Sequence, residues 1–115
     1  MNEPQAAYEL SVSRIFTASS RAVRHALTDS GLRGRWGGPM TAREERDGAI
    51  SMSGPAAGDA GPLALIRLYA ESGGTTRLEL RAGPYTEAGE IEARAQWNSA
   101  FSRLDTLLEE GLPGH

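Results

Sequence analysis

The 115-residue sequence contains no cysteine, and its only histidines are His25 and His115. The lack of cysteine excludes disulfides, thiol catalysis and thiolate metal sites, and it fits a reducing compartment. Two histidines, one of them the last residue, are too few for a histidine metal site, and we expect no Ser-His-Asp triad either. We therefore expect a domain without a metal and without a cofactor.

Long apolar runs are also missing. The longest, Leu63 to Ile66, is far too short to cross a bilayer. The first ten residues, Met1 to Leu10, hold neither the basic cluster nor the apolar run of a secretory signal. The sequence therefore predicts a cytoplasmic protein that does not insert into a membrane.

Lysine is absent too, and all twelve basic residues are arginine. Because arginine codons are GC-rich and lysine codons are not, this composition indicates a GC-rich genome of the actinobacterial kind. The net charge is −3, with Asp and Glu spread along the chain. Phosphate binding needs a basic face, so we expect no nucleic-acid partner.

The length predicts one domain with its own hydrophobic core. No internal repeat and no linker divides the chain, so residues 1–115 form a single unit in this interpretation. We expect the two ends, residues 1–7 and 112–115, to be flexible. The oligomeric state is left open between monomer and homodimer.

The N-terminal third predicts a strand followed by short helices. Tyr8 to Phe16 alternate between apolar and polar residues, which is typical of a half-buried strand. Ser19 or Ser20 can cap a following helix that runs to Asp29. A second short helical turn, set between glycines, carries Trp36.

The middle of the chain predicts antiparallel strands. Two short arms between Met40 and Gly54 flank Asp47-Gly48, which favours a tight turn with positive φ at both central positions. The segment Gly54 to Gly61 reads as a loop that can rim a pocket. Two further strands, Leu63 to Ala70 and Thr75 to Ala82, alternate so that their hairpin has one apolar face.

A long helix ends the chain. It runs from Glu87 or Glu90 to Glu110 and carries one apolar stripe, made of Trp97, Phe101, Leu104 and Leu108. A sheet with one apolar face must cover that face, and this helix has the only stripe long enough to do so. The sequence therefore predicts an α+β fold in which the sheet wraps around the C-terminal helix.

Three segments carry a family resemblance: Phe16-Thr17-Ala18, the run TDSGLRGRWGGP from Thr28 to Pro39, and the stripe of Trp97, Phe101 and Leu104. They resemble the START-like (SRPBCC) superfamily, and most of all its branch of homologues of the heat-shock-protein ATPase activator, where the second segment looks like TDPELLARWWGP. The resemblance implies a helix-grip fold, in which a curved antiparallel sheet grips a long C-terminal helix. It also implies a cavity between them for lipids, polyketides or other hydrophobic compounds.

The chain departs from this pattern at several positions. Arg24 stands where the family has a large aromatic residue, Gly37 replaces the second tryptophan, and Gln96 replaces the glycine before the last tryptophan. The chain is also shorter than typical members by about one hairpin, which we place at Gly54 to Gly61. A smaller sheet implies a shallower cavity, or one that is open on a side.

The expected ligand-binding residues are the inward side chains of the strands and of the long helix. The same positions are core positions, because in this fold the inward helix stripe is both core and pocket wall. Tyr69 is expected to point outward, and Tyr85 to lie where strand meets helix. The predicted ligand-binding set is Trp36, Ile50, Met52, Ile66, Leu68, Leu78, Leu80, Tyr85, Trp97, Phe101 and Leu104.

Three functions are compatible with this sequence. The first is non-catalytic binding of a hydrophobic small molecule, such as a lipid, a polyketide or another natural product. The second is an aromatase/cyclase-type enzyme that uses the same cavity; it predicts an inward ionisable residue with a displaced pKa, for which Arg14, Arg24 and Arg67 are the basic candidates. For each of the three we favour an exposed ion pair over a catalytic role. The third is a co-chaperone-like interaction module, which predicts an exposed apolar patch. We find no catalytic motif and favour binding.

Overall fold

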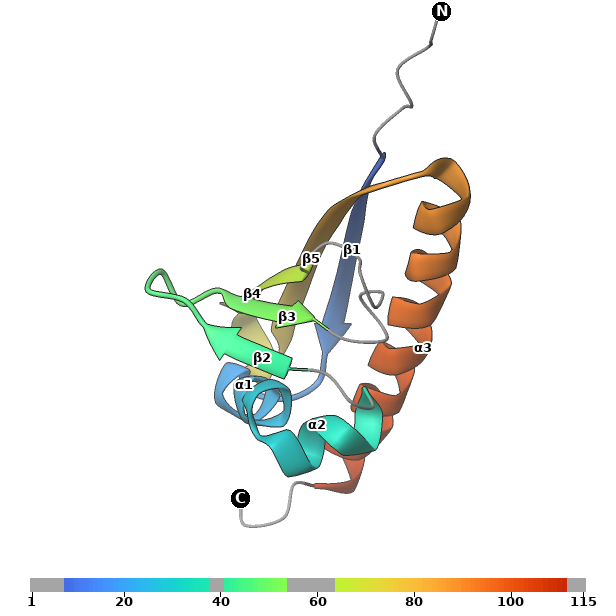
Figure 1. Cartoon of the computed structure of the whole chain (residues 1–115). Helices are drawn as coiled ribbons and strands as arrows, with labels where there is room; N and C mark the ends of the chain where they lie inside the picture. The colour runs from blue at the N-terminus through green and yellow to red at the C-terminus, as the bar shows by residue number, and fades with distance from the viewer. Residues whose placement is uncertain (1–7, 38–40, 54–63, 112–115) are drawn as a thin grey trace, which may run out of the picture.

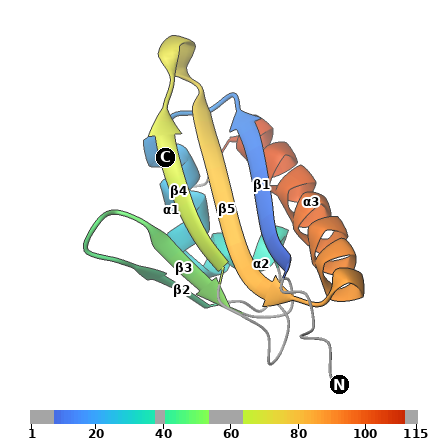
Figure 2. The same ribbon diagram turned by 90° about the horizontal axis from the view of Figure 1, so that it is seen from above.

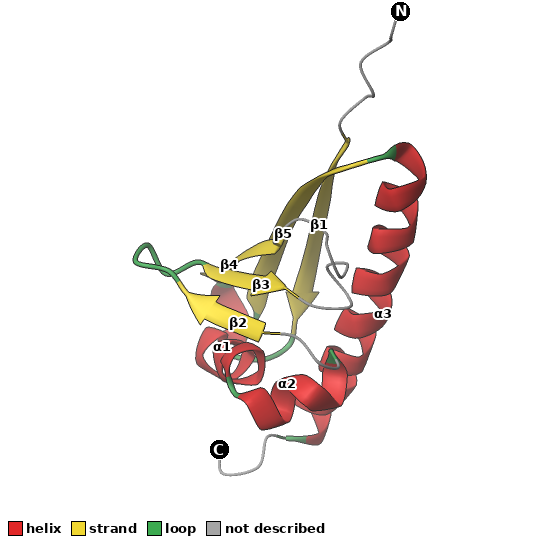
Figure 3. Ribbon diagram, in the orientation of Figure 1, coloured by secondary structure: helices red, strands yellow, loops and turns green. Residues whose placement is uncertain are grey.

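The computed structural model describes residues 8–37, 41–53 and 64–111 and shows an α+β fold (Figures 1 and 3). Two helices follow the first strand, four further strands come next, and a helix of 24 residues closes the chain. The elements are β1 (Tyr8–Phe16), α1 (Ser20–Thr28), α2 (Ser30–Trp36), β2 (Thr41–Glu44), β3 (Ile50–Ser53), β4 (Ala64–Ala70), the 3₁₀ turn η1 (Ser72–Gly74), β5 (Thr76–Tyr85) and α3 (Glu87–Glu110).

The five strands form one antiparallel sheet in the order β1-β5-β4-β3-β2. The helix α3 lies along β1 and β5, and α1 and α2 lie at one end of the sheet (Figures 1 and 2). The predicted helix-grip fold is therefore confirmed. The described part of the chain contains no helix with the length and apolar character needed to cross a bilayer.

Alternation in the central strands gives the sheet one apolar face. In β5 the side chains of Thr76, Leu78, Leu80 and Ala82 are buried, while the residues between them are more exposed. The neighbouring Ile66 of β4 is fully buried and lies opposite Leu80 in the register. The apolar faces predicted from the alternation are confirmed.

The strand β5 continues to Tyr85, three residues beyond the predicted end at Ala82. Its partner β1 has a register shift between Tyr8 and Leu10, so that Tyr85 pairs with Tyr8. At Gly83 the backbone has a φ of 150°, and a Cβ atom there would lie 3.1 Å from the carbonyl oxygen of Tyr8. Because glycine has no Cβ, it can adopt this φ and approach β1 closely at the register shift.

Side-chain caps fix where the helices begin. The Ser19 hydroxyl accepts a hydrogen bond from the amide of Ala22 at 3.1 Å, which starts α1 and confirms one of the two predicted caps. The Thr86 hydroxyl accepts from the amide of Gly89 at 3.0 Å, so α3 begins at Glu87 rather than at Glu90. Each cap satisfies an amide that has no partner within its helix.

The turn between β2 and β3 differs from the prediction. Gly48 has a φ of 86°, but Asp47 does not have a positive φ. The amide of Glu45 donates to the carbonyl of Ala49 at 2.8 Å, so three residues form the loop instead of two. The Asp47 carboxylate accepts from the amide of Ala49 at 3.1 Å, which holds the turn locally. The predicted two-residue turn is wrong, because Asp-Gly also suits a longer loop that ends in a left-handed glycine.

Two arginines fasten α3 to the edge strand β1. Arg94 donates to the carbonyl of Ser11 at 3.1 Å, and Arg14 donates to the carbonyl of Asn98 at 3.4 Å. A third arginine, Arg103, joins α3 to α2 through the carbonyl of Trp36 at 2.8 Å. The contact of Arg94 thus gives a partner to one main-chain carbonyl of the edge strand.

The buried side of α3 matches the predicted stripe with one difference. Trp97, Phe101 and Leu104 are fully buried. Near the end of the helix Leu107 is buried, whereas Leu108 is only partly buried and packs against the core. The helix period of 3.6 residues explains the shift, because the stripe drifts around a straight helix.

Several predictions fall outside the described residues. They concern the flexible ends, residues 1–7 and 112–115, and the loop Gly54 to Gly61. The strands on either side of that loop, β3 and β4, pair directly with each other.

Candidate ligand-binding site

The structure brings the predicted ligand-binding residues together in one apolar cluster on the inner face of the sheet. Two of them, Leu68 and Tyr85, are partly buried and pack against this cluster. The other nine are exposed by no more than 1 % of their surface: Trp36, Ile50, Met52, Ile66, Leu78, Leu80, Trp97, Phe101 and Leu104. We call these nine residues the inner cluster.

Phe101 lies at the aromatic centre of the inner cluster. Its ring centroid is 5.5 Å from that of Trp97 and 6.3 Å from that of Trp36. The ring of Phe16, at the end of β1, meets it edge to face at 6.2 Å. Phe16 was not among the predicted residues, although it continues the inward alternation of Leu10 and Val12 along β1.

The two buried tryptophans differ in how their indole N–H groups are satisfied. Trp36 donates from Nε1 to the carbonyl of Ala26 at 2.8 Å. Trp97 is equally buried, yet its Nε1 has no hydrogen-bond partner among the described residues. Buried polar atoms are nearly always hydrogen-bonded. The inner cluster therefore contains one donor, Nε1 of Trp97, for which the described residues supply no acceptor.

The three candidate arginines lie in three different surroundings. Arg14 belongs to the inner row of β1, and it contacts Ser102 Oγ at 3.4 Å and Asp105 at 3.8 Å on α3. Its side chain keeps 28 % of its exposure, so Arg14 lies at the rim of the inner cluster.

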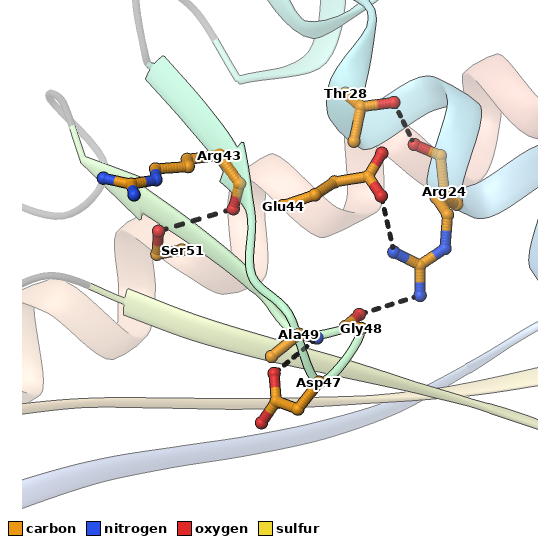
Figure 4. Close-up of polar contacts among 8 residues, drawn as sticks. All are labelled: Arg24, Thr28, Arg43, Glu44, Asp47, Gly48, Ala49 and Ser51. Atoms are coloured by element: carbon orange, nitrogen blue, oxygen red, sulfur yellow. Dashed lines mark hydrogen bonds and ion pairs between the residues drawn. The ribbon is translucent and has the colours of Figure 1, made fainter.

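Arg24 and Arg67 do not face the inner cluster. Arg24 points to the β2–β3 hairpin, where it contacts Glu44 at 3.7 Å and the carbonyl of Gly48 at 2.9 Å (Figure 4). Arg67 alternates with the buried residues of β4 and pairs with Asp47 at 2.8 Å. The inner-face alternative for these two arginines is wrong, because Arg24 extends from α1 to the hairpin and the alternation of β4 places Arg67 on the outer face. Each forms the exposed ion pair that we favoured.

Shifted pKa values occur in two places. On the hairpin, the hydrogen bond from Arg67 lowers the pKa of the Asp47 carboxyl, and the same contact raises the pKa of Arg67. Beside the inner cluster, burial raises the pKa of the Tyr85 hydroxyl. Tyr85 is therefore protonated at neutral pH.

Within residues 8–37, 41–53 and 64–111, no three His, Cys, Asp or Glu side chains gather closely enough to hold a metal ion.

Three surface clefts are lined by described residues, and none of the three is lined by a member of the inner cluster. The first, of about 310 Å³, lies on the outer face of the sheet among Leu65, Arg67, Tyr69, Glu79 and Arg81. The other two lie between α2 and α3 and beside the β2–β3 hairpin. The predicted cavity between sheet and helix thus stays a prediction, and the ring of Phe101 is in contact with three aromatic side chains there.

The outer face of the sheet carries two exposed apolar side chains, Ile15 and Tyr69. Tyr69 points outward, as the alternation predicts. Arg77 pairs with both residues in the register and places its guanidinium 4.3 Å from the centroid of the Tyr69 ring. A charged group therefore separates the two apolar residues, and they do not form one patch.

Solved structures of low sequence identity have the same fold. A protein from Mesorhizobium loti superposes with a TM-score of 0.73 at 16 % identity, over 91 % of this chain and 99 % of that one. A START superfamily protein from Mycobacterium smegmatis superposes with a TM-score of 0.64 at 10 % identity, over 89 % and 97 % of the two chains. The fold is START-like.

A third neighbour, from Rhodobacter sphaeroides, has a TM-score of 0.62 at 19 % identity and covers 96 % of this chain and 98 % of its own. No protein-family model and no curated protein matches the sequence. The START-like fold predicted from the sequence is thus confirmed, and the resemblance to the branch of heat-shock ATPase activator homologues stays a prediction.

Proposed function

We propose that this START-like domain binds a hydrophobic small molecule between the inner face of the sheet and α3, and that it does so without catalysing a reaction. A lipid, a polyketide or another natural product of mainly apolar surface is the expected ligand. Three features support the proposal: the fold, the convergence of the eleven predicted residues in one apolar cluster, and the unsatisfied indole of Trp97.

The orphaned N–H of Trp97 is the observation that carries the proposal. A buried donor without an acceptor costs about 1–3 kcal/mol of stability. Trp36, in the same cluster, shows that the fold can supply a main-chain acceptor to a buried indole. A bound molecule that accepts from Trp97 removes this cost, so the protein gains stability when it binds.

Small buried residues lie both on the sheet and on α3. Ala64 and Ala82 are buried and lie directly opposite each other on β4 and β5, and Ala93 and Ala100 are buried on α3. Because interiors pack densely, larger side chains at these positions would remove any space left for a guest. We therefore expect a ligand to lie over the two strand alanines.

A thermal-shift screen tests the proposal. Fatty acids, sterols and aromatic polyketides are added to the full chain, and a ligand that binds only the folded state raises its melting temperature, by an amount equivalent to about 2.7 kcal/mol at one hundred times Kd. Ala82→Leu should weaken the effect, whereas Ala95→Leu, at an exposed position of α3, should not. Melting of both variants without ligand controls for overpacking. No saturable shift with any apolar compound would contradict the proposal and favour an interaction module.

A cyclase-type enzyme is the second candidate, and one observation favours it. The Tyr85 hydroxyl lies beside the inner cluster, and burial raises its pKa, so it keeps its proton and can donate a hydrogen bond to a bound substrate. The test is turnover of a poly-β-ketone substrate by the wild type and by Tyr85→Phe. If Tyr85 takes part, the variant loses turnover and keeps binding.

Cytoplasmic location and a monomeric or homodimeric state stay predictions.

A further inference from the structure

We infer that the ligand is electrically neutral and that one of its oxygen atoms accepts a hydrogen bond from Nε1 of Trp97. This inference rests on the proposed function and narrows it to a chemical class. Ketones, quinones, esters, lactones and ethers with a mainly apolar skeleton belong to this class, and free fatty acids do not.

The first argument concerns the direction of the hydrogen bond. An indole nitrogen is a donor only, so it needs an oxygen or nitrogen with a free lone pair. Nε1 of Trp97 is buried and has no such partner among the described residues. An alkane leaves it unsatisfied, whereas a carbonyl or ether oxygen satisfies it.

The second argument is that two other buried polar side chains of the core are already satisfied. Trp36 donates to the carbonyl of Ala26 at 2.8 Å. Thr76, fully buried on β5, donates from Oγ1 to the carbonyl of Ala18 at 2.7 Å. Both groups are used within the fold, whereas Nε1 of Trp97 has no acceptor among the described residues.

The third argument concerns charge. A buried carboxylate needs a cation or several donors, because removing it from water is costly. Arg14, at the rim, is engaged with Asp105 and with the carbonyl of Asn98. Arg33, the one buried arginine among the described residues, donates to the carbonyls of Leu27 and Thr28 at 3.2 and 3.0 Å. An anionic head group beside Trp97 would compete with these contacts, which a neutral oxygen does not.

The two tryptophans give a direct spectroscopic test. The sequence contains only Trp36 and Trp97, so a ¹H–¹⁵N spectrum of the full chain shows two indole signals, which Trp97→Phe assigns. We expect the Trp97 proton to resonate upfield of the Trp36 proton without ligand. Addition of 9-fluorenone should move the Trp97 signal downfield and leave the hydrogen-bonded Trp36 signal nearly unchanged.

A matched set of compounds tests the chemical class. Fluorenone, fluorene and fluorene-9-carboxylate share a ring system and differ in having a neutral acceptor, no acceptor or a negative charge. We expect fluorenone to bind about three- to tenfold more tightly than fluorene, which is the range of one hydrogen bond, and the carboxylate to bind most weakly. In Trp97→Phe the advantage of fluorenone over fluorene should disappear. The acyclic pair 2-undecanone and undecanoate repeats the comparison for chain-like ligands.

The possible failures are distinguishable. If neither the ketones nor fluorene bind saturably, the proposed function itself fails. If fluorene binds as tightly as fluorenone, if a carboxylate binds best, or if Trp97→Phe keeps the preference for the ketone, binding stands and the inference is overturned. A water cross-peak to the Trp97 indole proton that persists at saturating fluorenone also overturns it, because a trapped water is then the acceptor.

Discussion

Nε1 of Trp36 lies 2.8 Å from the carbonyl oxygen of Ala26, and this hydrogen bond ties the short helix α2 to α1. Both residues are fully buried, so the bond is shielded from water. Trp97 has a ring of the same size and the same burial, but it has no such bond to any residue that the structure describes. Replacing each of the two tryptophans therefore distinguishes the stability that an indole contributes by packing from the stability that it contributes by hydrogen bonding.

We predict that Trp36→Phe lowers the free energy of unfolding by about 1 kcal/mol more than Trp97→Phe does in the absence of ligand. Both variants lose a similar ring volume, but only the first loses a buried hydrogen bond. Urea unfolding followed by far-UV circular dichroism measures the difference. Equal losses, or a larger loss for Trp97→Phe, would show that the Trp97 indole has an acceptor in the free protein.

The glycines of α2 and of the β2–β3 turn should respond in opposite ways to alanine. Gly48 has a φ of 86°, whereas Gly34 lies within the helix α2, and an added Cβ meets nothing within 4 Å at either position. Gly48→Ala should cost about 1 kcal/mol, because a left-handed conformation strains an L-residue. Gly34→Ala should gain about 0.5–1 kcal/mol from helix propensity. Thermal unfolding of both variants measures the two signs, and a loss at Gly34 would contradict the helix.

Acid should weaken the contact between Arg67 and Asp47. The hydrogen bond from Arg67 lowers the pKa of Asp47 in the folded state below its unfolded value. The contact therefore stabilises the protein fully above the unfolded pKa, and its contribution is lost as the pH falls below about 4. In an NMR titration, Arg67→Met should return the pKa of Asp47 toward its ordinary value. Arg43→Met, which removes a contact with Glu45 instead, should leave it unchanged.

Phe101 should be among the most costly residues of α3 to truncate. Its ring contacts Phe16, Trp36 and Trp97, and it is fully buried. Phe101→Ala should cost about 3–5 kcal/mol through lost apolar burial and the cavity that remains. Ile91→Ala is the matched control on the same helix, because Ile91 is 62 % exposed and should change stability by no more than about 0.5 kcal/mol. Similar losses in chemical unfolding would mean that α3 faces the sheet differently.

Periodicity explains why much of this fold was predictable from the sequence. The alternation in β5 fixes which side chains face inward, since a strand has a side-chain period of two. The stripe of Trp97, Phe101 and Leu104 fixes the buried side of α3 in the same way. These signals depend only on local geometry, so they survive in the structure.

Loop lengths and hydrogen-bond partners were not predictable in the same way. The loop at Asp47 has three residues because Glu45 and Ala49 pair across it, and the dipeptide Asp-Gly fits either length. The alternation of β4 places Arg67 on the outer face, but it does not tell that Arg67 pairs there with Asp47, 20 residues away. Likewise, no pattern in the sequence tells which of the two tryptophans finds an acceptor.

The hydrogen bond from Arg94 to the carbonyl of Ser11 joins residues 83 positions apart, and β1 pairs with β5 across most of the chain. During synthesis, β1 therefore cannot pair with β5 until residue 85 has left the ribosome, and it cannot pack against all of α3 until residue 110 has done so. Such distant pairing makes folding slower than in a helical bundle of this size, because the long chain between the partners must first be ordered. We expect the nascent protein to depend on protection from aggregation until its last helix has emerged.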